Sequence, residues 1–241
     1  MLRIAHVYGE YSSKYIATAL TMARVYQHLE KEMEWLWTKD LRINTVHVDD
    51  TARALWQAAV WFEHGKKDWD AKAWGSTPIF NIVDHGNTCT YRLIVHLRNR
   101  LRLLATPAVI VAPLHDRCLI EYIFPTAQGT LATLIAQVFN IQTGFQGQIA
   151  SSFARLNLDW TVDYINDETL GPWAELLAQA NITRPGPLSP FMEKELLKDM
   201  DLSLDGSRFE QVTGFRYEKE QLTKEGIEAM IESYRRMGWW P

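Results

Sequence analysis

Two polar residues follow short, mostly apolar runs, where their side chains could contact a ligand. His47 comes directly after Val46, and Asp84 ends the run Pro78–Val83. Ligands of open α/β sheets bind beyond the carboxyl ends of the strands, so both positions are candidates for substrate contact. The simpler interpretations are a histidine that is hydrogen-bonded within the fold and an aspartate that only closes a turn.

Acid–base catalysis is the next chemistry to consider, because Tyr11 and Lys14 stand close together. A lysine ammonium lowers the pKa of a tyrosine phenol when both lie on one helix face, which requires the spacing Tyr-x-x-x-Lys. The segment Tyr11-Ser-Ser-Lys14 is one residue too short. We interpret it as the solvated start of a helix and predict no catalytic residue.

The composition excludes several classes of function. The 241 residues carry a net charge of −4, which offers no basic surface to nucleic acid or to an anionic membrane. No apolar run approaches the ~18 residues of a membrane-spanning helix, and no leader pattern is visible. Cys89 and Cys118 have no metal-ligand spacing. We therefore expect a cytoplasmic protein without metal, nucleic-acid or membrane partners.

Hydrophobic patterning indicates the elements that would position these residues. The run Leu2–Val7 is typical of a strand buried on both faces of a parallel sheet. A helix is expected over residues 11–32, with Ile16, Leu20 and Ala23 on one face. The tryptophans, Trp35 and Trp37 among them, are assigned to the core and to helix faces rather than to a sugar site.

The carboxyl-terminal half reads as mostly helical. We expect helices over residues 128–139, 153–164 and 170–180, the last opened by Gly171-Pro172. A further helix is expected to start at Ser189-Pro190, and a last one to end at Gly238. The pair Trp239-Trp240 is expected to pack back onto the body of the protein.

Four segments share patterns with one enzyme family. Residues 2–9 read Leu-Arg-Ile-Ala-His-Val-Tyr-Gly, residues 47–54 contain His-Val-x-Asp-x-Ala-x-Ala, and residues 80–83 read Phe-Asn-Ile-Val. Residues 205–215 run from Asp-Gly-Ser-Arg to a closing Gly-Phe. In this order they resemble the extended short-chain dehydrogenase/reductases, the NAD-dependent epimerase/dehydratase family.

The resemblance implies an α/β fold. The last strands of a Rossmann-type parallel sheet would stand beside a mostly helical substrate-binding region. It assigns residues 1–90 to the last strands and helices of the nucleotide-binding region and residues 128–241 to the substrate-binding region. Residues 91–127 form an insert that the family does not match.

The resemblance also implies a cofactor and a substrate site. NAD or NADP serves the intact family, and the likeness places Val7, with His6 and Tyr8, beside the nicotinamide. His47 and Asp84 would then face a small-molecule substrate. In several relatives an arginine four residues before the histidine binds the phosphate of a nucleotide sugar. Ile43 holds that position here, which argues against a nucleotide-sugar substrate.

Two motifs of active relatives are missing. The 13 glycines form no glycine-rich phosphate turn, and no Tyr-x-x-x-Lys is present. We therefore expect the carboxyl-terminal, substrate-binding part of an NAD(P)-dependent oxidoreductase, epimerase or dehydratase, truncated and inactive alone. The intact family would form a homodimer. The alternatives are a non-catalytic interaction module that pairs through an open sheet edge and a product that does not fold.

The insert at residues 91–127 differs in composition from its surroundings, with five arginines and no lysine. We interpret it as a retained intron, with its donor in the codon of Cys89 and its acceptor shared by Thr126 and Ala127. Its removal would keep the reading frame and join Thr88 to the helix that begins at Gln128. A genuine loop insertion and a basic amphipathic element at a membrane are the alternatives.

Overall fold

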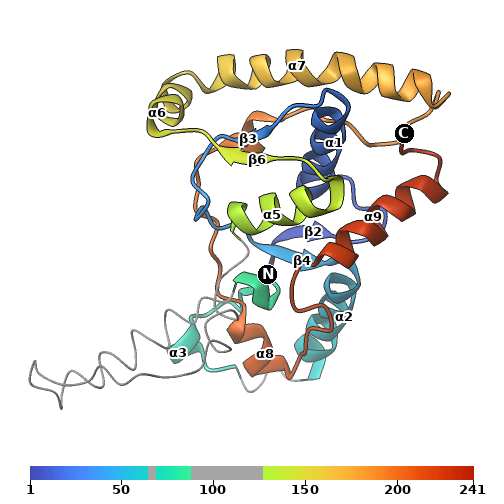
Figure 1. Cartoon of the computed structure of the whole chain (residues 1–241). Helices are drawn as coiled ribbons and strands as arrows, with labels where there is room; N and C mark the ends of the chain where they lie inside the picture. Colours follow the sequence, from blue (N-terminus) through green and yellow to red (C-terminus); the bar gives the residue numbers. More distant parts are fainter. Residues whose placement is uncertain (65–68, 88–126) are drawn as a thin grey trace, which may run out of the picture.

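The structure, a computed structural model, describes residues 1–64, 69–87 and 127–241. In these ranges the fold is mixed α/β, with helices around three pairs of short parallel strands (Figure 1). The pairs are β1 (Leu2–Ile4) with β5 (Phe80–Ile82), β2 (His6–Tyr8) with β4 (Thr45–His47), and β3 (Met33–Trp35) with β6 (Thr143–Phe145). The insert predicted at residues 91–127 lies outside the described residues except for Ala127.

The first strand predicted from the sequence forks into two. The Ala5 N–H donates to the Ile82 carbonyl at 3.1 Å, whereas the His6 N–H donates to the Asn44 carbonyl at 3.0 Å. The chain therefore changes partner between β1 and β2. The expectation of burial on both faces is wrong for β1, because Arg3 is exposed and Ile4 is 42% exposed. Among the described strands only β5 pairs with β1, so no described strand lies along the opposite edge of β1, which we call its open edge.

Helix α1 (Tyr15–His28) forms the centre of the main apolar core. Ile16, Leu20 and Ala23, the face predicted from the sequence, are fully buried. The core continues into α5 (Gln128–Phe139), whose bounds match the prediction, and into α9 (Lys224–Arg236). The expected helix over residues 11–32 is too long at both ends. Tyr11 has a φ of +63° and Lys14 is extended, so neither belongs to the helix.

The two helices expected over residues 153–164 and 170–180 have different bounds in the structure. Helix α6 (Gln148–Leu156) is followed by α7 (Leu158–Gln179), which runs straight through Pro172. Proline removes one backbone hydrogen bond, but Thr169, Trp173 and Leu176 on either side of it are buried, and this packing keeps the helix continuous. The helix expected from Ser189 is only a short 3₁₀ turn, η3 (Lys194–Leu197).

A second, smaller core lies under β4 and β5. It contains Phe80, Phe209 and Phe215 and is covered by α2 (Val48–His64) and α8 (Ser207–Thr213). The short elements α3 (Ala71–Trp74) and η2 (His85–Asn87) complete the described structure. None of the described helices combines the length and apolarity needed to cross a bilayer.

The end of the chain packs back onto the main core, as predicted. Trp240 is 7% exposed and its ring lies 6.0 Å from that of Trp173 and 5.9 Å from that of Tyr234. Gly186, with a φ of +62°, leaves room for Trp239, because an added Cβ would lie 2.5 Å from the indole ring. Both terminal tryptophans therefore belong to the structure of this region.

Candidate functional site

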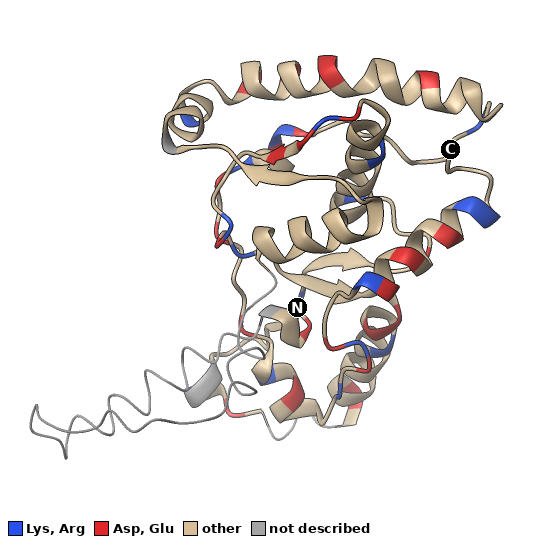
Figure 2. Cartoon of the chain, in the orientation of Figure 1, with Lys and Arg blue, Asp and Glu red and all other residues tan. Residues whose placement is uncertain are grey.

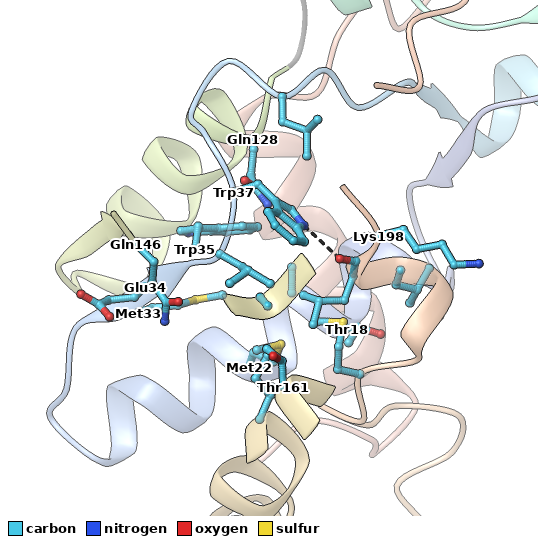
Figure 3. A pocket seen from close by; sticks show the side chains of 18 of the residues that line it. Thr18, Met22, Met33, Glu34, Trp35, Trp37, Gln128, Gln146, Thr161 and Lys198 are labelled. Carbon is cyan, nitrogen blue, oxygen red and sulfur yellow. Dashed lines mark hydrogen bonds between the residues drawn. The ribbon is translucent and has the colours of Figure 1, made fainter. Parts of the chain in front are cut away.

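A cavity of about 470 Å³ lies between α1, β3, α6, α7 and the segment around η3 (Figure 3). Its volume falls in the range of small-molecule sites. Aromatic residues and methionines make up a large part of its wall. The aromatic residues and methionines that line it are His6, Tyr15, Met22, Tyr26, Met33, Trp35, Trp37, Phe153, Trp160, Tyr164, Met192 and Met200.

His6 is the one residue of the predicted cofactor site that lines this cavity. Its imidazole stacks on the ring of Tyr15 at 4.3 Å between centroids, with the ring planes 14° apart. Burial lowers the pKa of His6 below the ordinary 6.5 and raises that of Tyr15 to about 12. At neutral pH both groups are therefore uncharged and contribute flat, apolar faces to the wall.

Three hydrogen-bonded polar side chains line one part of the cavity. The Tyr26 hydroxyl donates to Glu168 Oε2 at 3.0 Å, and Lys31 Nζ donates to Glu168 Oε1 at 3.1 Å. Burial, followed by the nearby Glu168 charge, raises the pKa of the Tyr26 phenol. Tyr26 thus stays protonated and acts as a donor, while each carboxylate oxygen of Glu168 accepts one of these hydrogen bonds.

Trp35, the last residue of β3, and the nearby Trp37 differ in their hydrogen bonding. Trp37 Nε1 donates to the Leu197 carbonyl at 2.9 Å, drawn as the dashed line in Figure 3. Trp35 Nε1 and Gln128 Oε1 are buried and have no hydrogen-bond partner among the described residues. These two atoms lie behind the surface of the cavity and leave one donor and one acceptor that the described part of the fold does not satisfy.

Val7 and Tyr8, the other predicted cofactor residues, are packed in the two cores. Successive side chains of a strand point to opposite faces, and Val7 packs against the smaller core while Tyr8 belongs to the main one. Tyr8 is 2% exposed and its ring meets that of His47 edge-on at 5.2 Å. Burial, then the charges of Asp84 and Asp50, raise the pKa of its phenol. Neither Val7 nor Tyr8 lines the cavity.

His47 is held at the carboxyl end of β4. Its Nδ1 accepts a hydrogen bond from the Asp49 N–H at 3.2 Å, and burial lowers its pKa. Gly9, with a φ of +122°, passes so close that an added Cβ would lie 2.8 Å from His47 Nε2. Only glycine fits both conditions. His47 thus has partners within the fold and does not line the cavity, and its contact with a substrate stays a prediction.

Asp84 is completely buried between β4 and β5. Its Oδ2 accepts from the Thr45 hydroxyl at 2.8 Å and its Oδ1 accepts from the Gly86 N–H at 3.1 Å. These bonds tie two strands together and close the turn that follows β5. Asp84 does not line the cavity either, and its role toward a substrate also stays a prediction.

Asp50, the aspartate of the His-Val-x-Asp pattern, contacts residues far along the chain. The buried Asp50 carboxylate accepts the N–H groups of Glu218 and Lys219 at 3.1 and 2.8 Å, and Arg53 Nη1 donates to it at 2.5 Å. The aspartate of the His-Val-x-Asp pattern therefore anchors the tail against α2. It is a structural residue of this chain.

Comparison with models of protein families finds no match, and no curated protein matches the sequence. The resemblance to the epimerase/dehydratase family thus stays a prediction from the four sequence segments. No three histidine, cysteine, aspartate or glutamate side chains of residues 1–64, 69–87 and 127–241 come together as a metal site. Within these ranges the best-formed candidate site is the aromatic cavity.

Proposed function

We propose that this chain is the carboxyl-terminal, substrate-binding part of an NAD(P)-dependent oxidoreductase, epimerase or dehydratase of the extended short-chain dehydrogenase/reductase type. The observation that carries the proposal is the open edge of β1. Among the described residues β1 has a neighbouring strand on one side only, and Ile4 is 42% exposed, so a further strand of a larger sheet could pair there.

Helix α2 supports the same proposal. One face packs through Ala54, Ala58 and Trp61 onto the smaller core. The other face exposes Leu55, Trp56 and Phe62, by 47%, 72% and 56%. A helix that is apolar on two faces is typical of the inside of a larger protein. A further helix could therefore pack on the exposed face of α2, just as a further strand could pair with β1.

The described residues do not fit a complete dinucleotide. A pyrophosphate needs a glycine-rich turn at a helix amino terminus or a cluster of arginines, and no arginine lines the cavity. The cofactor would supply hydride transfer from a region outside residues 1–241. This chain would hold the substrate, exclude water through its aromatic wall, and present the neutral face of His6.

Sequencing the full-length transcript tests the proposal. We expect an open reading frame before Met1 that encodes a glycine-rich turn and Tyr-x-x-x-Lys, together with a spliced form that lacks the insert at residues 91–127. Stop codons throughout the upstream region would contradict the enzyme. Absence of a shorter spliced product would contradict the intron alone.

The open edge of β1 also supports a second candidate function, a non-catalytic module that borrows a strand from another protein. This candidate predicts a stable complex of two different chains when the protein is purified from its source under native conditions. Isolation of the 241-residue chain as a soluble monomer would argue against it.

A further inference from the structure

We propose that the aromatic cavity binds a neutral ring compound and that it does not bind a nucleotide sugar. The inference rests on the proposed function, since it names the substrate class of that same site. Two features of the cavity carry it: its aromatic wall and the pairing of its charges.

The aromatic wall extends out to the surface. Trp160 stacks on Tyr164 at 5.5 Å with the ring planes 16° apart, and Phe153 meets Trp160 edge-on at 5.4 Å. These three rings line the cavity and yet remain 49–57% exposed. Exposed aromatic rings beside an apolar cavity form a surface on which a flat ring can stack. A ligand with an aromatic or fused-ring body would cover them.

The charges of the wall disfavour a phosphate. Two lysines line the cavity, and each is paired with a glutamate: Lys31 with Glu168 at 3.1 Å and Lys198 with Glu195 at 3.3 Å. Helix α7, which forms one side, carries acidic residues and no basic one (Figure 2). A diphosphate would need unpaired cations in this wall, and the described residues offer none there.

The wall is apolar where the nearest arginine of the chain segment could have reached it. Ile43 is 3% exposed and lines the cavity. The neighbouring Arg42 does not line the cavity and donates through Nε to Asp201 Oδ2 at 2.9 Å. This part of the wall therefore presents a hydrocarbon and no cation.

The test is a fluorescence titration of the full chain with 6-propionyl-2-dimethylaminonaphthalene, a neutral naphthyl ketone whose emission shifts to the blue in an apolar site. We expect saturable binding that unlabelled 2-acetylnaphthalene displaces and that UDP-glucose leaves unchanged. Trp35→Phe, which replaces an indole that lines the cavity by a smaller ring, should weaken binding roughly twofold to tenfold, the effect of a lost aromatic contact. Ala154→Phe, which fills the cavity, should abolish it.

Trp56→Phe is the matched control, because this exposed tryptophan lies on α2 outside the cavity. Circular dichroism of each variant separates loss of binding from loss of folding. Displacement by UDP-glucose, or weakening by Trp56→Phe rather than Trp35→Phe, would overturn the inference, and so would the absence of saturable binding. The transcript decides the proposed function separately. If the upstream motifs are present and the ketone does not bind, only the ligand class is wrong.

Discussion

The two regions of the molecule differ in what lies beneath their exposed apolar side chains. The main core around α1, packed with α5, α7, α9 and the terminal Trp240, borders a cavity whose outer wall exposes Phe153, Trp160 and Tyr164. The smaller core around Phe80 and Phe209 is well packed inside, but the elements that cover it expose Ile4, Leu55, Trp56 and Phe62 on their outer sides. Under the proposed function, the first region would hold a small ligand and the second would be covered by more protein.

The largest effect on stability should come from a substitution that leaves a cavity inside the main core. Leu20 of α1 is completely buried in the main core. We expect Leu20→Ala to lower the free energy of unfolding by about 2–5 kcal/mol, because it removes buried methyl groups and leaves a cavity. Leu55→Ala is the control on α2, and we expect a change below about 0.5 kcal/mol. Urea unfolding measures the free energy of unfolding of both variants. Equal losses would mean that α2 is covered after all.

Cutting the link between α2 and the tail should have the next largest effect. Asp50→Asn keeps the shape of the side chain but removes the charge that Glu218 N–H, Lys219 N–H and Arg53 share. We expect a loss of about 2–3 kcal/mol in the free energy of unfolding. Asp49→Asn, at an exposed position of the same helix turn, should change it little. Thermal unfolding followed by circular dichroism compares the pair.

The pH dependence of stability should identify the buried histidine of the cavity. Burial lowers the pKa of His6 from 6.5, so the unfolded chain binds a proton more readily than the folded one. Its contribution is therefore fully present above pH 6.5 and is lost as the pH falls below that value toward the lower pKa of the folded state. His6→Gln should remove part of this pH dependence, and the part due to His47, whose pKa burial also lowers, should remain. His64→Gln, at the exposed end of α2, should give the same dependence of stability on pH as the unmodified chain.

The smallest effect on stability should come from the uncovered face of α2. We expect the double substitution Leu55→Glu and Trp56→Glu to change the free energy of unfolding by less than about 0.5 kcal/mol and to leave binding of the naphthyl ketone unchanged. Self-association, measured by light scattering against concentration, should fall, because an exposed apolar patch promotes association. Loss of ketone binding would show that the two regions are not independent.

The sequence was a good guide where local pattern decides the outcome. The apolar spacing of Ile16, Leu20 and Ala23 identified the buried face of α1, and the uniform pattern of residues 128–139 gave the bounds of α5. It was a poor guide where distant contacts decide. Pro172 is accommodated because its neighbours in α7 pack on the core, and the exposure of β1 depends on which strands lie beside it.

The candidate site shows the same limit. Trp35 and Trp37 look equivalent in the sequence, yet Trp37 meets the carbonyl of Leu197, far along the chain, and Trp35 meets no partner among the described residues. Of the predicted site residues, only His6 lines the cavity, since strand alternation and the two cores take up Val7 and Tyr8. The aromatic rings of α6 and α7 carried a signal in their spacing, but nothing local indicated that they face Trp35.

The most direct test of the account is a fluorescence titration with NADH of the 241-residue chain beside the protein translated from the full-length transcript. We predict saturable binding by the longer protein and none by the 241 residues, because the residues that hold the dinucleotide would lie outside them. Saturable binding by the 241-residue chain, or its absence in the longer protein, would contradict the account.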